Sequence, residues 1–279
     1  MKNAMQLKAY VKNLAKEKKI SAQIVLQNYM LERLLERIFV SKYHDNFILK
    51  GGFLLAAMVG LDTRATMDMD ATIKGLPVTK ETISGMFVDI CKIHIDDDIN
   101  FEFSGIDDIR EDDEYGGYRV SLTGNYPPMA VPLKIDITTG DKITPREMVY
   151  SFNLMFEERS TNVLAYTVET ILAEKLETII SRGNQNTRPR DYYDVYILNT
   201  LQKQNIDNQI LEEAFAATVK KRGTGHIVAN YKEIIETVAN STVMNNQWTR
   251  YQKEFEYAKD IRFENTCKAV NELIVGIEE

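Results

Sequence analysis

The spacing of apolar residues changes near residue 167 of this 279-residue chain. Before that point, short runs with a two-residue period alternate with segments whose apolar residues recur every three or four positions. This alternation indicates strands mixed with helices. After it, nearly every segment has the helical period. The pattern predicts an α/β domain over residues 1–166, with helices at its N-terminus, and an α-helical domain over residues 167–279.

Capping residues and apolar runs place the individual elements. Ser21 and Thr79 are of the type that begins helices, because the side-chain oxygen accepts a hydrogen bond from an otherwise unpaired backbone N–H. We expect helices at residues 2–18, 21–39, 53–60, 79–93, 168–181, 189–201, 206–220, 228–240 and 245–277. We expect strands at residues 47–49, 67–73, 99–104, 117–123, 130–137, 149–156 and 163–166.

A double glycine, Gly51-Gly52, lies between a predicted strand and an apolar helical segment. Glycine lets backbone N–H groups approach an anion at a helix N-terminus. Asp68 and Asp70 follow on the next strand, where a spacing of two places both side chains on one face. Two carboxylates lie close together when a cation offsets their charge, and Mg²⁺ binds one or two carboxylates together with substrate phosphates. We therefore expect a nucleoside-triphosphate (NTP) site and phosphoryl or nucleotidyl transfer.

Asp136 is a candidate third carboxylate. On the strand predicted at 130–137 it shares a face with Lys134, whereas Ile135 and Ile137 point the other way. Two-metal nucleotidyl transfer uses carboxylates that hold two Mg²⁺ ions about 3.5–4 Å apart, one at the attacking hydroxyl and one at the triphosphate. The alternative for Asp136 is an ordinary carboxylate at a sheet edge.

The helical part contains a second polar group. Lys175 lies in a largely apolar helix and needs an exposed face or a partner. Arg182 and Arg188 stand at the two ends of a polar loop that could cover a triphosphate, and Arg190 and Asp191 follow it. The alternative is a solvated helix connection, with a proline at the helix start and ordinary charges in the first turn.

Charge is unevenly distributed along the chain, whose net charge is −7. Residues 1–50 carry ten Lys and Arg against four Asp and Glu, whereas residues 51–170 carry ten against twenty-one. The acidic run at 107–114 is interpreted as a solvated loop. Overall acidity argues against nonspecific nucleic-acid binding, although a local basic surface remains compatible with it.

Composition is that of an ordinary soluble globular protein, with 44% hydrophobic and 27% charged residues. The longest apolar stretch, residues 53–61, is too short to cross a bilayer, and the N-terminus lacks the apolar core of a signal peptide. Cys91 and Cys267 form neither a metal-type cluster nor a disulfide framework. We expect a cytoplasmic protein that does not bind membranes.

Four motifs together resemble those of the AbiEii/AbiGii-type nucleotidyltransferase toxins. In chain order they are Lys50-Gly51-Gly52, RATMDMD at 64–70, AEKL at 173–176 and RDYYD at 190–194, within roughly residues 45–200. This family belongs to the polymerase-beta-like nucleotidyltransferases and is the toxin half of type IV toxin–antitoxin and phage abortive-infection systems. The wider superfamily often has Gly-Ser where this chain has Gly51-Gly52, so the hydroxyl at that position is missing here.

The resemblance implies an α/β nucleotidyltransferase lobe with a mixed sheet, an α-helical lobe and an active site between them. It implies Mg²⁺ as cofactor, an NTP as substrate, and an antitoxin encoded nearby that acts without a stable protein complex. Family members differ in whether a third strand aspartate is used, which leaves both roles open for Asp136. The implied site residues are Gly51 and Gly52 at the phosphates, Asp68 and Asp70 as metal ligands, Lys175 as a phosphate contact and Asp191 as a second essential carboxylate.

The acceptor of the nucleotide is less defined. Family resemblance points to the 3′ end of tRNA. The fold equally supports transfer to a protein or a small molecule, and a binding module without catalysis is a third reading. The intact aspartates and Lys175 argue against that third reading. For an RNA acceptor we expect docking through the basic N-terminal segment, Arg182, Arg188 and the basic turn at 220–222.

Overall fold

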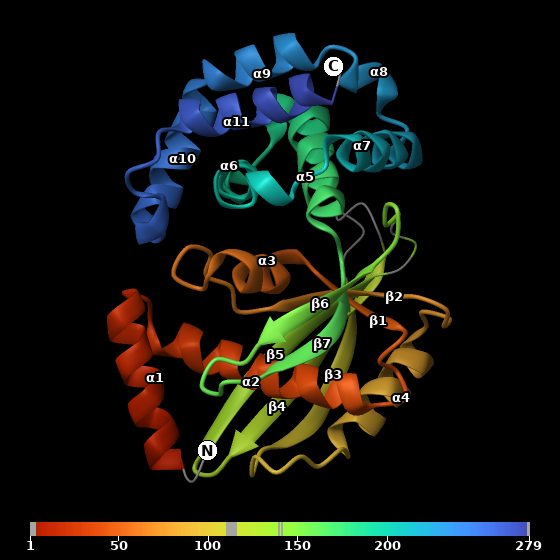
Figure 1. The fold of residues 1–279 in the computed structure, drawn as a ribbon, viewed down its shortest axis with the longest axis vertical. Coiled ribbons are helices and arrows are strands. Elements are labelled where there is room, and N and C mark those ends of the chain that lie inside the picture. Colours follow the sequence, from red (N-terminus) through yellow and green to blue (C-terminus); the bar gives the residue numbers. More distant parts are fainter. Residues whose placement is uncertain (1–3, 110–115, 139, 141, 278–279) are drawn as a thin grey trace. The chain divides into compact units, whose positions relative to one another are not determined.

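The structure is a computed structural model that describes residues 4–109, 116–138, 140 and 142–277. The chain divides into two compact units (Figure 1). The first unit contains Met1–Asp141 and Met148–Ala165, and the second contains Lys142–Glu147 and Tyr166–Glu279. We keep the predicted domains, 1–166 and 167–279, as our proposal for the folding units of the chain.

A seven-stranded sheet forms the centre of the first unit, with strand order β3-β4-β5-β2-β1-β7-β6. The pairs β1–β7 and β2–β5 are parallel and the other neighbours are antiparallel, so the sheet is mixed, as predicted. The strands are β1 (Phe47–Lys50), β2 (Met69–Ile73), β3 (Asn100–Ile109), β4 (Gly117–Tyr126), β5 (Met129–Thr138), β6 (Met148–Asn153) and β7 (Ser160–Ala165).

Helices begin where the capping residues predict. Ser21 and Thr79 accept hydrogen bonds from the backbone N–H groups of Ile24 and Thr82. In the first unit α2 packs on β5 and β7, and α4 packs on β3 (Figure 1). The helices of this unit are α1 (Ala4–Lys18), α2 (Ala22–Val40), α3 (Gly51–Val59) and α4 (Lys80–Cys91).

Strand β5 has the predicted alternation. Ile135 and Ile137 are completely buried, whereas Lys134 is exposed and Asp136 is partly exposed. One face of this strand therefore contributes to the apolar core, and the other presents charged side chains. This alternation fixes the face on which a polar site can form.

The acidic run at 107–114 differs from the predicted loop in its first residues. Asp107 and Asp108 belong to β3, which extends to Ile109. They pair with β4 residues at the open edge of the sheet, where both carboxylates are exposed. Residues 110–114 of the run lie outside the described residues.

Helices make up the second unit: α5 (Val168–Arg182), α6 (Pro189–Leu201), α7 (Asn208–Arg222), α8 (Gly225–Val228), α9 (Tyr231–Ala239), α10 (Thr242–Glu254) and α11 (Phe263–Gly276). The single helix predicted at 245–277 was wrong, because α10 ends at Glu254 and α11 begins at Phe263. From α10, Trp248 and Gln252 donate hydrogen bonds to the carbonyl of Ile261 in the break, at 2.8 and 2.9 Å. These side chains satisfy backbone groups that a continuous helix would have paired. None of the helices that the structure describes has both the length and the apolar character needed to span a membrane.

A buried ion pair anchors α2 to the segment before β3. The Arg37 side chain is completely buried and donates to both carboxylate oxygens of Asp97, at 2.9 and 2.7 Å. It also donates to the carbonyls of Ile93 and Ile99, at 3.1 and 2.6 Å. A charge removed from water needs this degree of pairing, because removing one partner leaves the other buried and uncompensated.

We expect Asp97→Ala to lower the free energy of unfolding by about 3–5 kcal/mol, because it leaves the Arg37 guanidinium unpaired in the core. Asp108→Ala removes the partner of Lys80 in a solvent-exposed ion pair. That control should leave the urea midpoint close to the wild-type value, since exposed pairs contribute little. Urea unfolding of both variants measures the difference. Equal midpoints for the two variants would show that the buried pair has no special role.

Candidate functional site

The turn between β1 and α3 admits only glycine at its first position. Gly51 has a φ of +65°, and a Cβ there would lie 2.1 Å from the Asp70 Oδ2 atom. The Gly52 backbone N–H donates to the same oxygen at 3.3 Å. The first turn of α3 therefore lies directly against the Asp70 carboxylate, and its N–H groups lie at the end of the helix that attracts anions.

The position of Gly52 also accounts for the missing hydroxyl. A Cβ on Gly52 would lie 2.9 Å from the Thr66 hydroxyl oxygen, which already occupies the space of a side chain there. The Thr66 hydroxyl donates to the Asp68 carbonyl at 3.3 Å, and the Asn28 side chain donates to the Thr66 carbonyl at 2.7 Å. A hydroxyl is thus present beside the glycine turn, supplied by Thr66.

Four charged residues form one row across the sheet. Lys50 on β1 lies opposite Asp70 on β2, Asp70 lies opposite Asp136 on β5, and Asp136 lies opposite Arg119 on β4. Side chains that lie opposite each other on neighbouring strands point to the same face. The charge row therefore consists of two adjacent carboxylates with a cation at each end.

Arg119 binds both oxygens of the Asp136 carboxylate. Its Nε and Nη2 atoms donate to the two oxygens at 2.8 and 2.7 Å, the bidentate geometry that makes arginine–carboxylate pairs strong. The hydrogen bonds and charge of Asp136 raise the pKa of the Arg119 guanidinium. The Asp136 side chain is 18% exposed and that of Arg119 is 43% exposed, so solvent reaches the pair from the arginine side.

Among the described residues, Asp70 has no bidentate partner of the kind that Arg119 is for Asp136. Burial is the largest cause that raises the pKa of its carboxyl group, and the negative charges of Asp136 and Asp68 add to it. The positive charge of Lys50 and the hydrogen bond from Gly52 act in the opposite direction without cancelling the shift. Ionised Asp70 would therefore be stabilised by a further cation at this position.

Asp68 lies just before β2, because the strand begins at Met69, and its side chain is exposed. The predicted strand placed Asp68 and Asp70 on one strand face by their spacing alone. In the structure Asp68 belongs to the approach to the strand, and its charge acts on Asp70. The two carboxylates therefore interact electrostatically, although only Asp70 lies on the strand.

The fit to a metal can be tested on these carboxylates. Among the described residues, no three His, Cys, Asp or Glu side chains form a group that would hold a metal. Arg119 occupies both oxygens of Asp136. Mg²⁺ needs only one or two carboxylates, however, because phosphate oxygens and water complete its coordination. Asp68 and Asp70 fit that smaller requirement, and Asp136 as a metal ligand stays a prediction.

Lys175 has the partner that its apolar surroundings require. Its Nζ atom lies 2.9 Å from Asp191 Oδ1 and 2.7 Å from Asp194 Oδ2. The ammonium group on α5 is thus held between two carboxylates of α6, which are three residues apart on one helix face. The Asp194 side chain is completely buried, whereas those of Lys175 and Asp191 are 17% and 14% exposed.

The three predicted arginines, Arg182, Arg188 and Arg190, lie between Lys175 and Asp191 in the sequence. Arg182 ends α5, and the Arg188 backbone N–H donates to the Asn186 side chain at 2.8 Å. The guanidinium carbon of Arg190 lies 5.4 Å from the ring centre of Phe255. The structure therefore brings Lys175 and Asp191 together, but it places Arg190 on an aromatic ring.

Sequence reasoning assigned no role to Arg119 or Asp194. Asp194 is part of the RDYYD motif, and its spacing of three from Asp191 is a signal that both share a helix face. Arg119 has no motif around it. Only the pairing of β4 with β5 identifies its partner.

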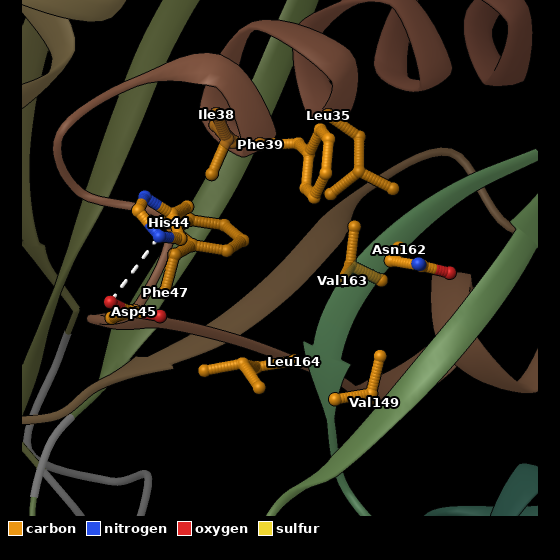
Figure 2. Close-up of a pocket in the computed structure, with 10 residues that line it drawn as sticks. All are labelled: Leu35, Ile38, Phe39, His44, Asp45, Phe47, Val149, Asn162, Val163 and Leu164. Carbon is orange, nitrogen blue, oxygen red and sulfur yellow. Dashed lines mark ion pairs between the residues drawn. The ribbon is translucent and has the colours of Figure 1, made fainter.

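A pocket elsewhere in the first unit contains none of the predicted residues. It has a volume of about 140 Å³ and is lined mainly by apolar side chains, among them Phe39, Phe47 and Val163 (Figure 2). His44 and Asp45 form its polar edge, with 3.2 Å between His44 Nε2 and Asp45 Oδ2. Its small size and apolar lining make it unsuitable for a triphosphate.

Comparison with known proteins identifies the family of the chain. The sequence model of the family described as "Nucleotidyl transferase AbiEii toxin, Type IV TA system" matches residues 33–269. The comparison with curated proteins found no match. The motifs that predicted this family lie within the matched range.

Two solved structures are similar in fold. A protein of H. pylori proposed to be a nucleotidyltransferase has 16% sequence identity and a TM-score of 0.50, over 93% of this chain and 96% of its own. JHP933 from Helicobacter pylori has 15% identity and a TM-score of 0.51, over 92% of this chain and 93% of its own. The predicted nucleotidyltransferase fold, with a mixed sheet followed by helices, is confirmed.

We expect Gly51→Ala to weaken NTP binding at least tenfold, because the new Cβ would displace the Asp70 carboxylate and the positive φ is strained for alanine. Gly85→Ala, on an open face of α4, is the matched control. It should keep NTP affinity and raise the free energy of unfolding by about 0.5–1 kcal/mol. Titration with a fluorescent NTP analogue measures the NTP affinity of both variants, and urea unfolding measures the stability of Gly85→Ala. Wild-type affinity in Gly51→Ala would exclude the turn from the nucleotide site.

Proposed function

The chain belongs to the AbiEii family of nucleotidyl transferase toxins of type IV toxin–antitoxin systems, and we propose that it transfers a nucleoside monophosphate from an NTP to the 3′ end of a tRNA. Membership makes the chain an NTP-dependent nucleotidyltransferase with an antitoxin as partner. Our proposal adds tRNA as the acceptor of the nucleotide, Mg²⁺ as the cation and the residues that form the active site. It also adds action in the cytoplasm, where NTPs and tRNA occur, and an antitoxin that forms no stable complex with the toxin.

The charge row is the observation that carries the proposal. Asp70 lies between the α3 N-terminus and a second carboxylate, so one surface offers backbone N–H donors for phosphate and carboxylates for a cation. Nucleotidyltransferases generally use a divalent metal, and we propose Mg²⁺ held by Asp68 and Asp70. Bound there, it would offset charge on the triphosphate and on the leaving pyrophosphate.

The protein groups at this turn have separate tasks in the proposed reaction. The Gly52 N–H keeps Asp70 Oδ2 in a fixed orientation, and we assign the phosphates to the glycine turn at the N-terminus of α3. The Thr66 hydroxyl lies beside Gly52 and donates to the Asp68 carbonyl, so it helps to orient the segment that carries Asp68. Pre-oriented donors of this kind stabilise charge that develops during transfer without having to reorganise.

For the second group we propose a phosphate contact and a proton acceptor. Lys175 is a point charge suited to phosphate oxygens. Buried Asp194 positions its ammonium group, as the 2.7 Å contact indicates. Asp191 is more accessible, and we assign it the proton of the attacking hydroxyl. Arg182, Arg188 and Arg190 stay candidates for contacts with the nucleotide.

An RNA acceptor requires a local basic surface on this acidic chain. Lys8, Lys12 and Lys16 are exposed on α1, while Leu7 and Val11 on the same helix are buried. Phosphates of a tRNA acceptor arm fit such a surface, and the unpaired 3′ nucleotides can reach a site that a duplex cannot enter. Arg222, in the predicted basic turn, instead pairs with the buried carboxylate of Glu177, so we leave it out of this surface.

We expect the purified protein, incubated with radiolabelled NTPs and Mg²⁺, to label total tRNA. Asp68→Asn and Asp70→Asn should abolish the label, because each removes a carboxylate that the cation needs. Both variants should unfold at or above the wild-type midpoint, since repulsion between carboxylates is relieved. Parallel incubations with protein extract and with small molecules test other acceptors. Label on those alone would contradict an RNA acceptor, and the absence of label everywhere would contradict transfer.

We expect Lys175→Ala to raise the dissociation constant for NTP about tenfold, the loss of about 1.4 kcal/mol of binding free energy. Arg222→Ala is the control, because it too removes the cation beside a completely buried carboxylate of the second unit. Both variants should lose stability, as buried Asp194 and Glu177 become uncompensated. NTP titration separates the roles: an equal loss of affinity in both variants would show that Lys175 acts through folding alone.

A further inference from the structure

Arg119 is placed to do more than join two strands. Strands β4 and β5 are paired along all 10 residues of each strand, so the hairpin does not depend on one side-chain contact. The Arg119 side chain is 43% exposed although it binds Asp136 through two hydrogen bonds, so its guanidinium is open to solvent and to solutes. Its location at the end of the charge row therefore calls for another explanation.

The electrostatics of the row supply one. Arg119 is bound bidentately to Asp136, and its charge also interacts with Asp68 and Asp70. It faces the group of carboxylates that we assign to the cation site. In the absence of a ligand, the guanidinium offsets the repulsion between Asp136 and Asp70, which lie directly opposite each other.

A bound nucleotide changes this balance. A nucleoside triphosphate with one divalent cation brings excess negative charge to the row, and it presents phosphate oxygens spaced like those of a carboxylate. The planar guanidinium has five N–H donors and binds carboxylate and phosphate with the same fork geometry. Arg119 can therefore exchange one partner for the other by rotation of its exposed side chain, with the strands unchanged.

We propose that Arg119 binds the triphosphate of the NTP and that Asp136 holds its guanidinium in place until the nucleotide arrives. The inference rests on the proposed NTP site and adds a residue to it. Exchange leaves Asp136 without its arginine and beside Asp70, where it is available to the cation that accompanies the nucleotide. Asp136 lies on an interior strand and not at a sheet edge, and in this proposal it is the partner of Arg119 before the nucleotide binds and a candidate cation ligand afterwards.

Binding of NTP in EDTA, measured by calorimetry without turnover, tests this exchange. Arg119→Ala should raise the dissociation constant about tenfold, and Arg119→Lys should raise it less, because lysine keeps the charge but loses the fork. Asp136→Asn should bind NTP as tightly as wild type or several-fold more tightly, since the competing partner of Arg119 is weakened. The double variant Arg119→Ala/Asp136→Asn should behave as Arg119→Ala.

The control is Arg159→Ala. Arg159 has a side chain that is 47% exposed and pairs with carboxylates of the first unit, so it matches Arg119 in type, exposure and partners. This variant should bind NTP as wild type does. A structural role for the Arg119–Asp136 pair predicts instead that Arg119→Ala and Asp136→Asn lose affinity together.

The outcomes separate this inference from the function on which it rests. If wild type binds NTP and labels an acceptor while Arg119→Ala binds NTP equally well, the role of Arg119 is contradicted and the nucleotidyltransferase site stands. If wild type binds no NTP, both are contradicted. Should Arg119→Ala not fold, Arg119→Lys is still expected to bind NTP more weakly than wild type, and Asp136→Asn at least as tightly as wild type.

Discussion

Asp70 and Asp136 lie directly opposite each other on parallel strands, and this juxtaposition of like charges determines the chemistry of the sheet. Directly opposed carboxylates repel each other, so such a pair persists only when positive charge lies beside it. Lys50 and Arg119 supply that charge at the two ends of the row, and the N–H groups of the glycine turn add to it. A surface that balances two carboxylates in this way accepts a cation and an anionic substrate together.

The second unit uses the same physical principle in a helical setting. Lys175 lies between Asp191 and Asp194, and the most buried of the three groups is a carboxylate. Desolvated charges need partners at hydrogen-bond distance, so the lysine orientation is fixed by helix geometry. Arg37 and Asp97 show the purely structural use of such a pair in the first unit, where the guanidinium is completely buried. Accessibility distinguishes the candidate site pairs from the structural one.

Sequence periodicity predicted most elements, because burial of one face imposes a two-residue or a 3.6-residue period on the chain. The caps at Ser21 and Thr79 followed from the same local chemistry. Strand order is not local: β5 pairs in parallel with β2, so the proximity of Asp136 to Asp70 could not be read from spacing. Arg119 was missed for the same reason. The break between α10 and α11 contains neither glycine nor proline, and its cause is tertiary, as the contacts of Trp248 and Gln252 with Ile261 show.

The dependence of NTP affinity on Mg²⁺ tests most directly whether the charge row is a nucleotide site. The dissociation constant of an NTP is measured by calorimetry on the wild-type chain, in EDTA and at rising Mg²⁺ concentration. A cation held by Asp68 and Asp70 predicts at least tenfold tighter binding with Mg²⁺, about 1.4 kcal/mol, and loss of that gain in Asp70→Asn. The same affinity in EDTA and in Mg²⁺, or an undiminished gain in Asp70→Asn, would contradict a cation site at these carboxylates.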